Sequence, residues 1–312
     1  ILGGIRAVLW TDFIQACVLW VGGVISLGVI IYHLPGGLGQ IFEVASEHAK
    51  FSMSDIDAQG EMFKVPWGPD LTKKTVSLFL LVGLSNWLTE YSSNQNVIQR
   101  YAASKSAKEA RIAMWTCCIF SVPTWGLFMF LGTALFVFFQ VFPTEMAGDI
   151  LHGAEQHKAE EILPYFVINY LPRGLTGLVI AGVLSAAMSS LSSSINSVSA
   201  VGLVDVYRRH MVHGKTDRHY VIVAKSIALV VAVIMIGGAY LLWKLQSTTL
   251  QDSASILTAL TAGGLLGLYL LGFFTRVGND RSVLTGIFFT VLFTLWMALS
   301  TISSRSTIRR KQ

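Results

Sequence analysis

Charged side chains are scarce in this chain of 312 residues. Asp, Glu, Lys and Arg together make up 13% of it, whereas hydrophobic residues make up 53%. Soluble domains carry about 25% charged residues, so the deficit argues against a soluble domain and indicates a membrane protein. In such a protein the excess of basic residues behind the formal net charge of +5 helps to set the orientation of the chain in the bilayer. It does not indicate nucleic-acid binding, and we expect no nucleic-acid partner.

Cysteines and catalytic motifs are also lacking. The three cysteines, Cys17, Cys117 and Cys118, lie within apolar stretches and predict no disulfide framework. The chain contains no Gly-x-Ser-x-Gly, His-Glu-x-x-His or Walker-type sequence, and no apolar stretch pairs a histidine with a candidate nucleophilic serine. We therefore predict that the chain is not an enzyme and that it has no catalytic and no cofactor-binding residue.

Long apolar stretches are what the chain has instead. Each is long enough to cross a hydrocarbon core of about 30 Å, which takes about 20 helical residues. Because barrel strands would be shorter and alternating, the pattern predicts an all-α integral membrane protein with about seven transmembrane helices. The stretches are Val8–His33, Val76–Val97, Ile112–Phe139, Gly174–Val206, Val221–Trp243, Ala254–Phe274 and Ser282–Thr301.

Basic residues gather in alternate loops. Residues 100–111 and 208–225 are rich in Lys and Arg, whereas the loops before and after them are mixed or acidic. The positive-inside rule places the basic loops in the cytoplasm and makes residues 34–75 an external loop. The basic residues at 305–311 do not fit this scheme. Both a eukaryotic plasma membrane and a bacterial inner membrane agree with the charge pattern.

The chain begins with Ile1 and reaches its first apolar stretch within a few residues. No basic n-region and no cleavage site precede that stretch, so no signal peptide is predicted. We interpret residues 1–312 as one transmembrane domain and as an internal fragment whose N-terminal helices are missing.

Serine is concentrated in the fourth apolar stretch, where the segment Gly182–Val201 ends just before Asp205-Val-Tyr207. Ala186, Ser189, Ser190 and Ser193 share one face of a helix. Small residues allow close helix packing, which is one explanation. Hydroxyls and backbone carbonyls are also the oxygen ligands that a small hard cation prefers, so ion binding is the other.

Two further groups of polar residues lie inside apolar stretches. Asp12 lies about one turn into the first stretch, where a carboxylate is costly; it faces an ion or cavity, or it reaches the nearby interface. In the second stretch, Asn86, Trp87, Glu90 and Tyr91 are typical of a cavity lining. A helix break near residues 91–94 is expected there, since broken helices expose groups that hold substrates. The alternative is a helix end that emerges into the cytoplasm.

With these residues the chain resembles the sodium:solute symporter family. Four segments carry the resemblance: Trp10-Thr-Asp-Phe-Ile-Gln15, Tyr91-Ser-Ser-Asn-Gln-Asn-Val-Ile-Gln-Arg-Tyr101, Ser185–Ser197 with Asp205-Val-Tyr207, and Gly263–Phe274. The resemblance implies an inverted-repeat fold of the LeuT type, of which this chain would supply the fifth to tenth core helices and one more. It also implies sodium-coupled symport of a small solute by alternating access.

The resemblance further implies a set of ligands. Ala186, through its backbone carbonyl, with the hydroxyls of Ser189 and Ser190, would hold the main sodium ion. Asp12, Ser192 and Ser193 resemble a second sodium site found in members that couple two ions. On this basis Na⁺ is the co-transported ion, with two ions per cycle.

The resemblance assigns the substrate-binding residues less directly than the sodium ligands. Asn86, Trp87, Glu90 and Tyr91 fall in the register of substrate or gate residues, and Ser255 stands where the sugar-transporting branch has a glutamine. The departure argues against a glucose-type pocket, and the Tyr91–Tyr101 pattern is similar to that of anion and sialic acid symporters. We expect an organic anion, a sugar or a sugar acid, and no obligate protein partner. An uncoupled channel or a sensory membrane domain on the same fold is the alternative.

Overall fold

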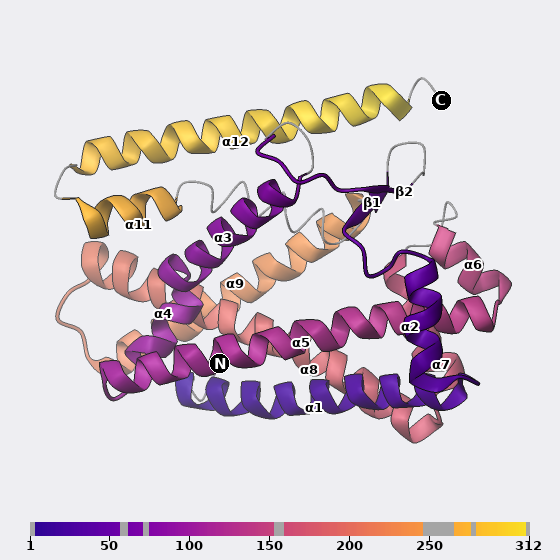
Figure 1. Cartoon of the computed structure of the whole chain (residues 1–312). Coiled ribbons are helices and arrows are strands. Elements are labelled where there is room, and N and C mark those ends of the chain that lie inside the picture. Colours follow the sequence, from indigo (N-terminus) through magenta and orange to yellow (C-terminus); the bar gives the residue numbers. More distant parts are fainter. Residues whose placement is uncertain are drawn as a thin grey trace. The chain divides into compact units, whose positions relative to one another are not determined.

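The computed structural model describes residues 4–56, 62–70, 75–152, 159–245, 265–275 and 279–309. The described chain is almost entirely helical (Figure 1). It forms two compact units, one of residues 1–65 and 104–239 and the other of residues 66–103 and 240–312. The expectation of a single transmembrane domain stays a prediction.

The first unit contains five long or medium helices and several short elements. Its main helices are α1 (Gly4–His33), α2 (Gly37–Glu47), α5 (Ala107–Val141), α8 (Arg173–Val201) and the larger part of α9 (Asp217–Leu245). Its shorter elements are β1 (Ser54–Ile56), β2 (Met62–Lys64), α6 (Glu145–His152), a 3₁₀ turn (Ala159–Glu161), α7 (Ile162–Tyr170) and a π-helix (Gly202–Met211).

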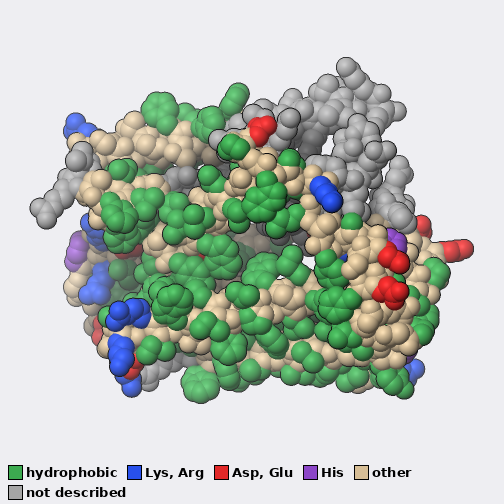
Figure 2. Space-filling view, viewed as in Figure 1, with side chains coloured by type: hydrophobic (Ala, Val, Ile, Leu, Met, Phe, Trp, Pro, Cys, Tyr) green, Lys and Arg blue, Asp and Glu red, His purple; other side chains and the backbone are tan. Residues whose placement is uncertain are grey.

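Four helices of the described chain are long and apolar enough to cross a membrane. They are Val8–His33, Ala107–Val141, Arg173–Met211 and Asp217–Leu241, and they confirm the first, third, fourth and fifth predicted stretches. Their outward side chains are strongly apolar, as on α9, where Val230, Val233 and Ile234 are 57%, 62% and 66% exposed. Hydrophobic side chains are spread widely over the face seen in Figure 2. Such surfaces suit contact with lipid.

The other predicted stretches are only partly represented among the described residues. The second corresponds to α3 (Val76–Ser93), which ends before the predicted Val97. The seventh corresponds to α12 (Asp280–Arg309), whose apolar part is Arg281–Trp296. Of the sixth, α11 (Leu265–Phe274) is described, and its earlier residues lie outside the described chain.

The apolar core of the first unit lies where α1, α2, α5 and α7 meet. Ile30, Ile41, Phe138 and Phe166 are almost completely buried there. Phe138 makes an edge-to-face contact with Phe166, with ring centroids 5.1 Å apart. Such aromatic pairs add to the stabilisation from burial alone. Part of the predicted external loop, the helix α2, is therefore packed onto the helices rather than extended away from them.

A small antiparallel hairpin adds strand to the predicted all-α class. In it Ser54 of β1 pairs with Lys64 of β2. Both strands lie in the predicted external loop. The hairpin does not alter the helical architecture.

Helices α1 and α8 pack closely and run antiparallel, since Gly22 of α1 meets Val179 of α8 whereas Asp12 meets Ser189. A Cβ atom placed on Gly22 would lie 3.4 Å from Val179 Cα, and one placed on Gly182 would lie 3.2 Å from the Val18 carbonyl oxygen. The glycines therefore let the two backbones approach more closely than larger residues allow. This close contact fixes the register of α1 against α8.

In the second unit α3 contacts α11 and is followed by α4 (Gln95–Ala102). Asn94 lies between α3 and α4, and its backbone angles, a φ of −72° and a ψ of 118°, are extended rather than helical. Its side chain caps α4 by accepting a hydrogen bond of 2.9 Å from the Asn96 N–H. The predicted break near residues 91–94 is confirmed as a break at one residue.

A candidate ion site between α1 and α8

The side chain of Asp12 joins α1 to α8 through two serines. Ser189 Oγ donates a hydrogen bond of 2.6 Å to Asp12 Oδ1, and Ser193 Oγ donates one of 3.3 Å to Oδ2. All three side chains are partly buried. The structure thus brings together a carboxylate and two hydroxyls from segments far apart in the sequence.

Local geometry explains why both serines meet one carboxylate. Ser189 and Ser193 are four residues apart on α8, so they lie one above the other on the same face. The glycine contacts at Gly22 and Gly182 hold α1 close enough for the short side chain of Asp12 to reach that face. The spacing of the serines and the small residues of the helix pair act together to form the site.

The predicted main-site residues occupy the neighbouring turn. Ser190 Oγ donates a hydrogen bond of 3.3 Å to the backbone carbonyl oxygen of Ala186. Ser190 is exposed, whereas Ala186 and Ser192 are partly buried. Ser189, predicted for the main site, contacts Asp12 instead and therefore lies between the two predicted groups. The division of these oxygens between two ions stays a prediction.

The donor set at this position is made of oxygen atoms. A carboxylate, hydroxyls and a backbone carbonyl suit hard cations such as Na⁺, Ca²⁺ or Mg²⁺. Among the residues that the structure describes, no group of three or more His, Cys, Asp and Glu is placed to hold a metal ion. A single carboxylate among neutral oxygens carries one negative charge, so a bound monovalent cation is neutralised, whereas a divalent cation keeps one uncompensated positive charge.

The predicted substrate residues lie in the second unit, on α3. The rings of Trp87 and Tyr91 stack with centroids 5.6 Å apart and an interplanar angle of 19°. Glu90 Oε2 accepts a hydrogen bond of 2.8 Å from Asn94 Nδ2 at the helix break. Asn86, Trp87 and Glu90 are exposed within the described chain. Ser255 lies outside the described residues.

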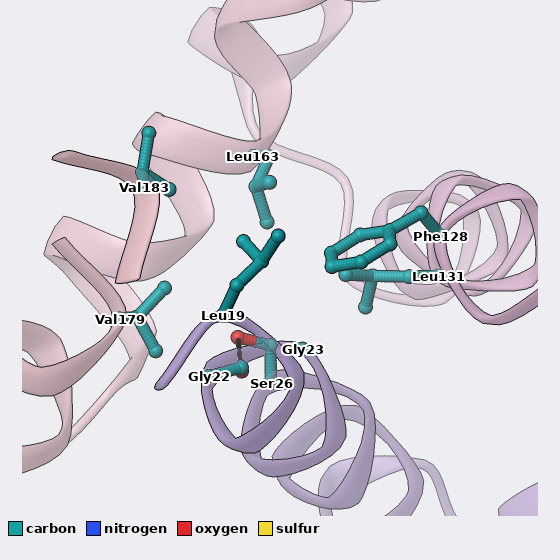
Figure 3. Close-up of a pocket in the computed structure, with 9 residues that line it drawn as sticks. All are labelled: Leu19, Gly22, Gly23, Ser26, Phe128, Leu131, Leu163, Val179 and Val183. Carbon is teal, nitrogen blue, oxygen red and sulfur yellow. Dashed lines mark hydrogen bonds between the residues drawn. The ribbon is translucent and has the colours of Figure 1, made fainter. Parts of the chain in front are cut away.

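A small cavity lies in the first unit, about two helical turns along α1 from Asp12. It has a volume of about 20 Å³ and is lined by α1, α5, α7 and α8. Figure 3 shows Leu19 of α1 at its centre, between Val179 and Val183 of α8 and Phe128 of α5. The hydroxyl of Ser26, drawn at its edge, donates to the Gly22 carbonyl oxygen. An apolar space of this size is too small for an organic solute.

Gln15 lies on α1 three residues after Asp12, and the sequence analysis assigned it no functional role. Its Oε1 atom is buried and accepts no hydrogen bond from the described part of the chain. The spacing of three residues from Asp12 is the signal that could have drawn attention to it, because residues three apart share a helix face.

Comparison with known proteins identifies the class and then the family. The four long apolar helices are those of a multi-pass membrane protein. The model of the sodium:solute symporter family matches residues 1–289. The chain therefore belongs to this family, and the resemblance inferred from its motifs is confirmed. Since members are transporters, the prediction that the chain is not an enzyme is confirmed as well.

Individual relatives agree with this assignment. The chain is 28% identical to the sodium/sialic acid symporter of Aliivibrio fischeri, over 96% of this chain and 56% of the relative, and 29% identical to that of Proteus mirabilis, over 94% and 56%. It is 29% identical to the human sodium/iodide cotransporter, over 96% of this chain and 44% of the relative. The chain spans about half the length of the curated relatives that it matches.

A solved structure supports the predicted fold. The structure of a Na⁺-coupled sialic acid symporter, in a substrate-bound outward-open state that reveals a novel Na⁺ site, matches with a TM-score of 0.76 and 29% identity. The match covers 93% of this chain and 56% of the symporter chain. The predominantly helical, LeuT-like membrane fold and the integral membrane location are thereby confirmed.

Proposed function

We propose that the transporter to which this chain belongs couples the inward movement of Na⁺ to the uptake of a small organic solute by alternating access. The single observation that supports this most strongly is the contact of Asp12 with Ser189 and Ser193. It supplies charged and neutral oxygen ligands at one place between two membrane helices. Membership of the sodium:solute symporter family supports Na⁺ as the ion.

Two sodium ions per cycle form the finer part of the proposal. Asp12, Ser192 and Ser193 would hold one ion, and the Ala186 carbonyl with Ser189 and Ser190 would contribute to the other. Ser189 lies at the boundary and can serve either ion by rotating its hydroxyl. Each elementary charge that moves through the membrane potential contributes about 2.3 kcal/mol per 100 mV. Because an anionic solute offsets the charge of one sodium ion, a second ion would supply the net charge on which the potential acts.

Ion entry requires a local rearrangement of hydrogen bonds. The hydroxyls of Ser189 and Ser193 now donate to Asp12, whereas a bound cation needs their oxygen lone pairs. The protons must turn away from the carboxylate as the ion takes their place. Rotation about a serine hydroxyl is a small motion, so the helices do not have to separate.

For the solute we propose an organic anion or a sugar acid. The sialic acid symporters among the relatives support a sugar acid, and the iodide cotransporter supports an anion. The stacked rings of Trp87 and Tyr91 offer an apolar face for a solute, and the Glu90–Asn94 pair offers polar atoms beside it. The remaining contacts would come from other helices of the transporter.

The test is uptake by the full-length transporter in proteoliposomes. Labelled sialic acid, sugars, short monocarboxylates and proline are offered with and without an inward sodium gradient, and Ser189→Ala is compared with Ser226→Ala. Ser226 is an exposed serine on α9 that donates to Ile222 of its own helix, so it is a matched control. Sodium-driven uptake of one solute that Ser189→Ala impairs would support the proposal. Uptake indifferent to sodium would refute it and favour an uncoupled channel.

A further inference from the structure

The connection from α8 to α9 carries positive charge that the described chain does not compensate. Within residues 205–225 the basic side chains outnumber the acidic ones, and all of the basic ones are exposed. None of them forms an ion pair with an acidic side chain among the described residues. The basic residues are Arg208, Arg209, Lys215, Arg218 and Lys225, and the acidic residues are Asp205 and Asp217.

This connection lies at the level of the bilayer surface. Helix α8 has 29 residues, and at about 1.5 Å per residue it spans roughly 44 Å, the thickness of a bilayer with its headgroups. The π-helix continues α8 directly, so Arg208 and Arg209 lie beyond the hydrocarbon core. Because only residues 212–216 separate the π-helix from α9, α9 starts at the same surface.

Exposed apolar side chains accompany the basic ones. Met211 ends the π-helix, and Val221 and Ile222 lie in the first turns of α9. At the boundary of a bilayer, apolar side chains contact acyl chains while Lys and Arg contact phosphates. A soluble anion bound to the same cations would leave these apolar side chains in water. The mixture therefore favours a lipid as the partner.

Two tyrosines hold the connection in one shape. Tyr207 Oη and His219 Nε2 lie 2.9 Å apart, in a hydrogen bond that joins the π-helix to α9. The buried Tyr220 donates a hydrogen bond of 3.2 Å to the Val212 carbonyl oxygen. The Arg208 guanidinium lies over the Tyr220 ring, 5.3 Å from its centroid. Because this backbone is already ordered, less conformational entropy is lost when its cations bind a partner.

We propose that residues 207–225 form a binding surface for the headgroups of anionic phospholipids. Arg209 and Arg218 are exposed, and their guanidinium groups make no hydrogen bond or ion pair with the described chain. They bind the phosphate oxygens of the headgroup, which a planar guanidinium matches with two parallel hydrogen bonds. The surface requires neither the sodium sites nor the solute, so its failure and that of the proposed function are independent.

Arginines at the two ends of α8 provide the variants. Arg209→Gln and Arg218→Gln each remove one positive charge from the surface, and a double variant removes both. Arg209→Lys alters the side chain but keeps its charge. Arg173→Gln is the matched control, because Arg173 is an exposed arginine at the first residue of α8, a helix length away from the surface.

The experiment measures the affinity of phosphatidylglycerol for the purified full-length transporter in detergent by native mass spectrometry. Phosphatidylcholine is the neutral comparison, and glycerol phosphate is the soluble competitor. We expect phosphatidylglycerol to bind more tightly than phosphatidylcholine. Each glutamine substitution should weaken its binding about fivefold, and the double variant about 25-fold. Arg209→Lys and Arg173→Gln should bind it as the unaltered transporter does.

Several results would overturn the proposal. Equal affinity of phosphatidylglycerol for the unaltered transporter and the double variant is one, and an equal loss in Arg173→Gln is another. If phosphatidylcholine binds as tightly, the surface does not recognise headgroup charge. If glycerol phosphate displaces the lipid at an equal concentration, the surface binds soluble phosphates instead. Should the double variant fail to fold, the single variants compared with Arg209→Lys decide the question.

Discussion

Ser189 Oγ lies 2.6 Å from Asp12 Oδ1 and donates a hydrogen bond to it. This contact links α1 and α8, which correspond to the first and fourth predicted membrane stretches, at a single acidic group. Ser189 also lies beside the turn that carries Ala186 and Ser190. Ser189 therefore stands between the two groups of oxygen atoms for which ion binding is proposed.

Ser189→Ala is expected to raise the sodium concentration for half-maximal uptake about tenfold or more. The substitution removes an oxygen ligand and leaves Asp12 with one fewer donor, and hydrogen bonds to charged groups contribute about 1.5–3 kcal/mol. The measurement is the sodium dependence of solute uptake in proteoliposomes. The Ser226→Ala control should retain the original dependence, and an unchanged dependence in Ser189→Ala would refute the role of this hydroxyl.

Asp12→Asn is expected to lower the Hill coefficient for sodium toward one. Asparagine preserves the size of the side chain and can still accept from Ser189, but it lacks the charge that attracts a second cation. Initial uptake rates across a sodium titration provide the measurement. A coefficient already near one in the unaltered transporter would remove the claim of two ions.

The resemblance of four motifs predicted the family, and the long apolar stretches predicted the helical class. The polar face of α8 was predictable because helical periodicity determines which residues of one helix share a face. The sequence did not predict that Ser189 contacts Asp12. That pairing depends on the register between two helices, which the close contacts at Gly22 and Gly182 determine. Such contacts have no signal in the periodicity of either helix alone.

The helix break was also predictable, since the polar run after Tyr91 contains residues that cap helices well. Its position at Asn94 follows from the side chain, which accepts from Asn96 N and donates to Glu90. The burial of Gln15 Oε1 could not be predicted, because it results from the packing of α1 on its neighbours. The role expected of Ser255 remains a prediction, since that residue lies outside the described chain.

Trp87→Ala is expected to raise the solute KM several-fold while the sodium dependence is retained. The substitution removes one ring of the stacked pair with Tyr91, and an aromatic contact contributes about 0.5–1.5 kcal/mol beyond its buried area. Trp115→Ala is the control, since Trp115 is a 64% exposed tryptophan on α5. Equal KM values for the two variants would contradict a substrate role for the Trp87–Tyr91 stack.

Alkaline pH is expected to destabilise the transporter partly through Tyr170, at the end of α7 before the fourth predicted membrane stretch. Burial, with a smaller contribution from Tyr165, raises the pKa of Tyr170 above its usual value of 10.0. The unfolded chain therefore releases this proton at lower pH than the folded chain does, so stability falls as the pH rises above about 10.

Thermal unfolding in detergent between pH 8 and 11 tests this effect. Tyr170→Phe should show a smaller loss of apparent melting temperature at the alkaline end than the unaltered transporter shows. Parallel curves for the two proteins would exclude a contribution from Tyr170.

Gly182→Ala is expected to destabilise the contact between α1 and α8 and to weaken sodium binding. The added Cβ atom would lie 3.2 Å from the backbone carbonyl oxygen of Val18, which cannot move aside as a flexible side chain can. Overpacking of this kind costs about 1–3 kcal/mol. Since the same contact sets the distance between Asp12 and Ser189, a shift of the backbones also disturbs the ion ligands.

Gly177→Ala is the matched control, because Gly177 lies on the same helix and a Cβ atom there would meet no atom within 4 Å. Alanine favours helix over glycine by up to about 1 kcal/mol, so this variant should be as stable as the unaltered transporter or more so. The apparent melting temperature and the sodium affinity are measured for both. If Gly182→Ala lowers neither, the close contact of α1 with α8 does not control the geometry of the ion site.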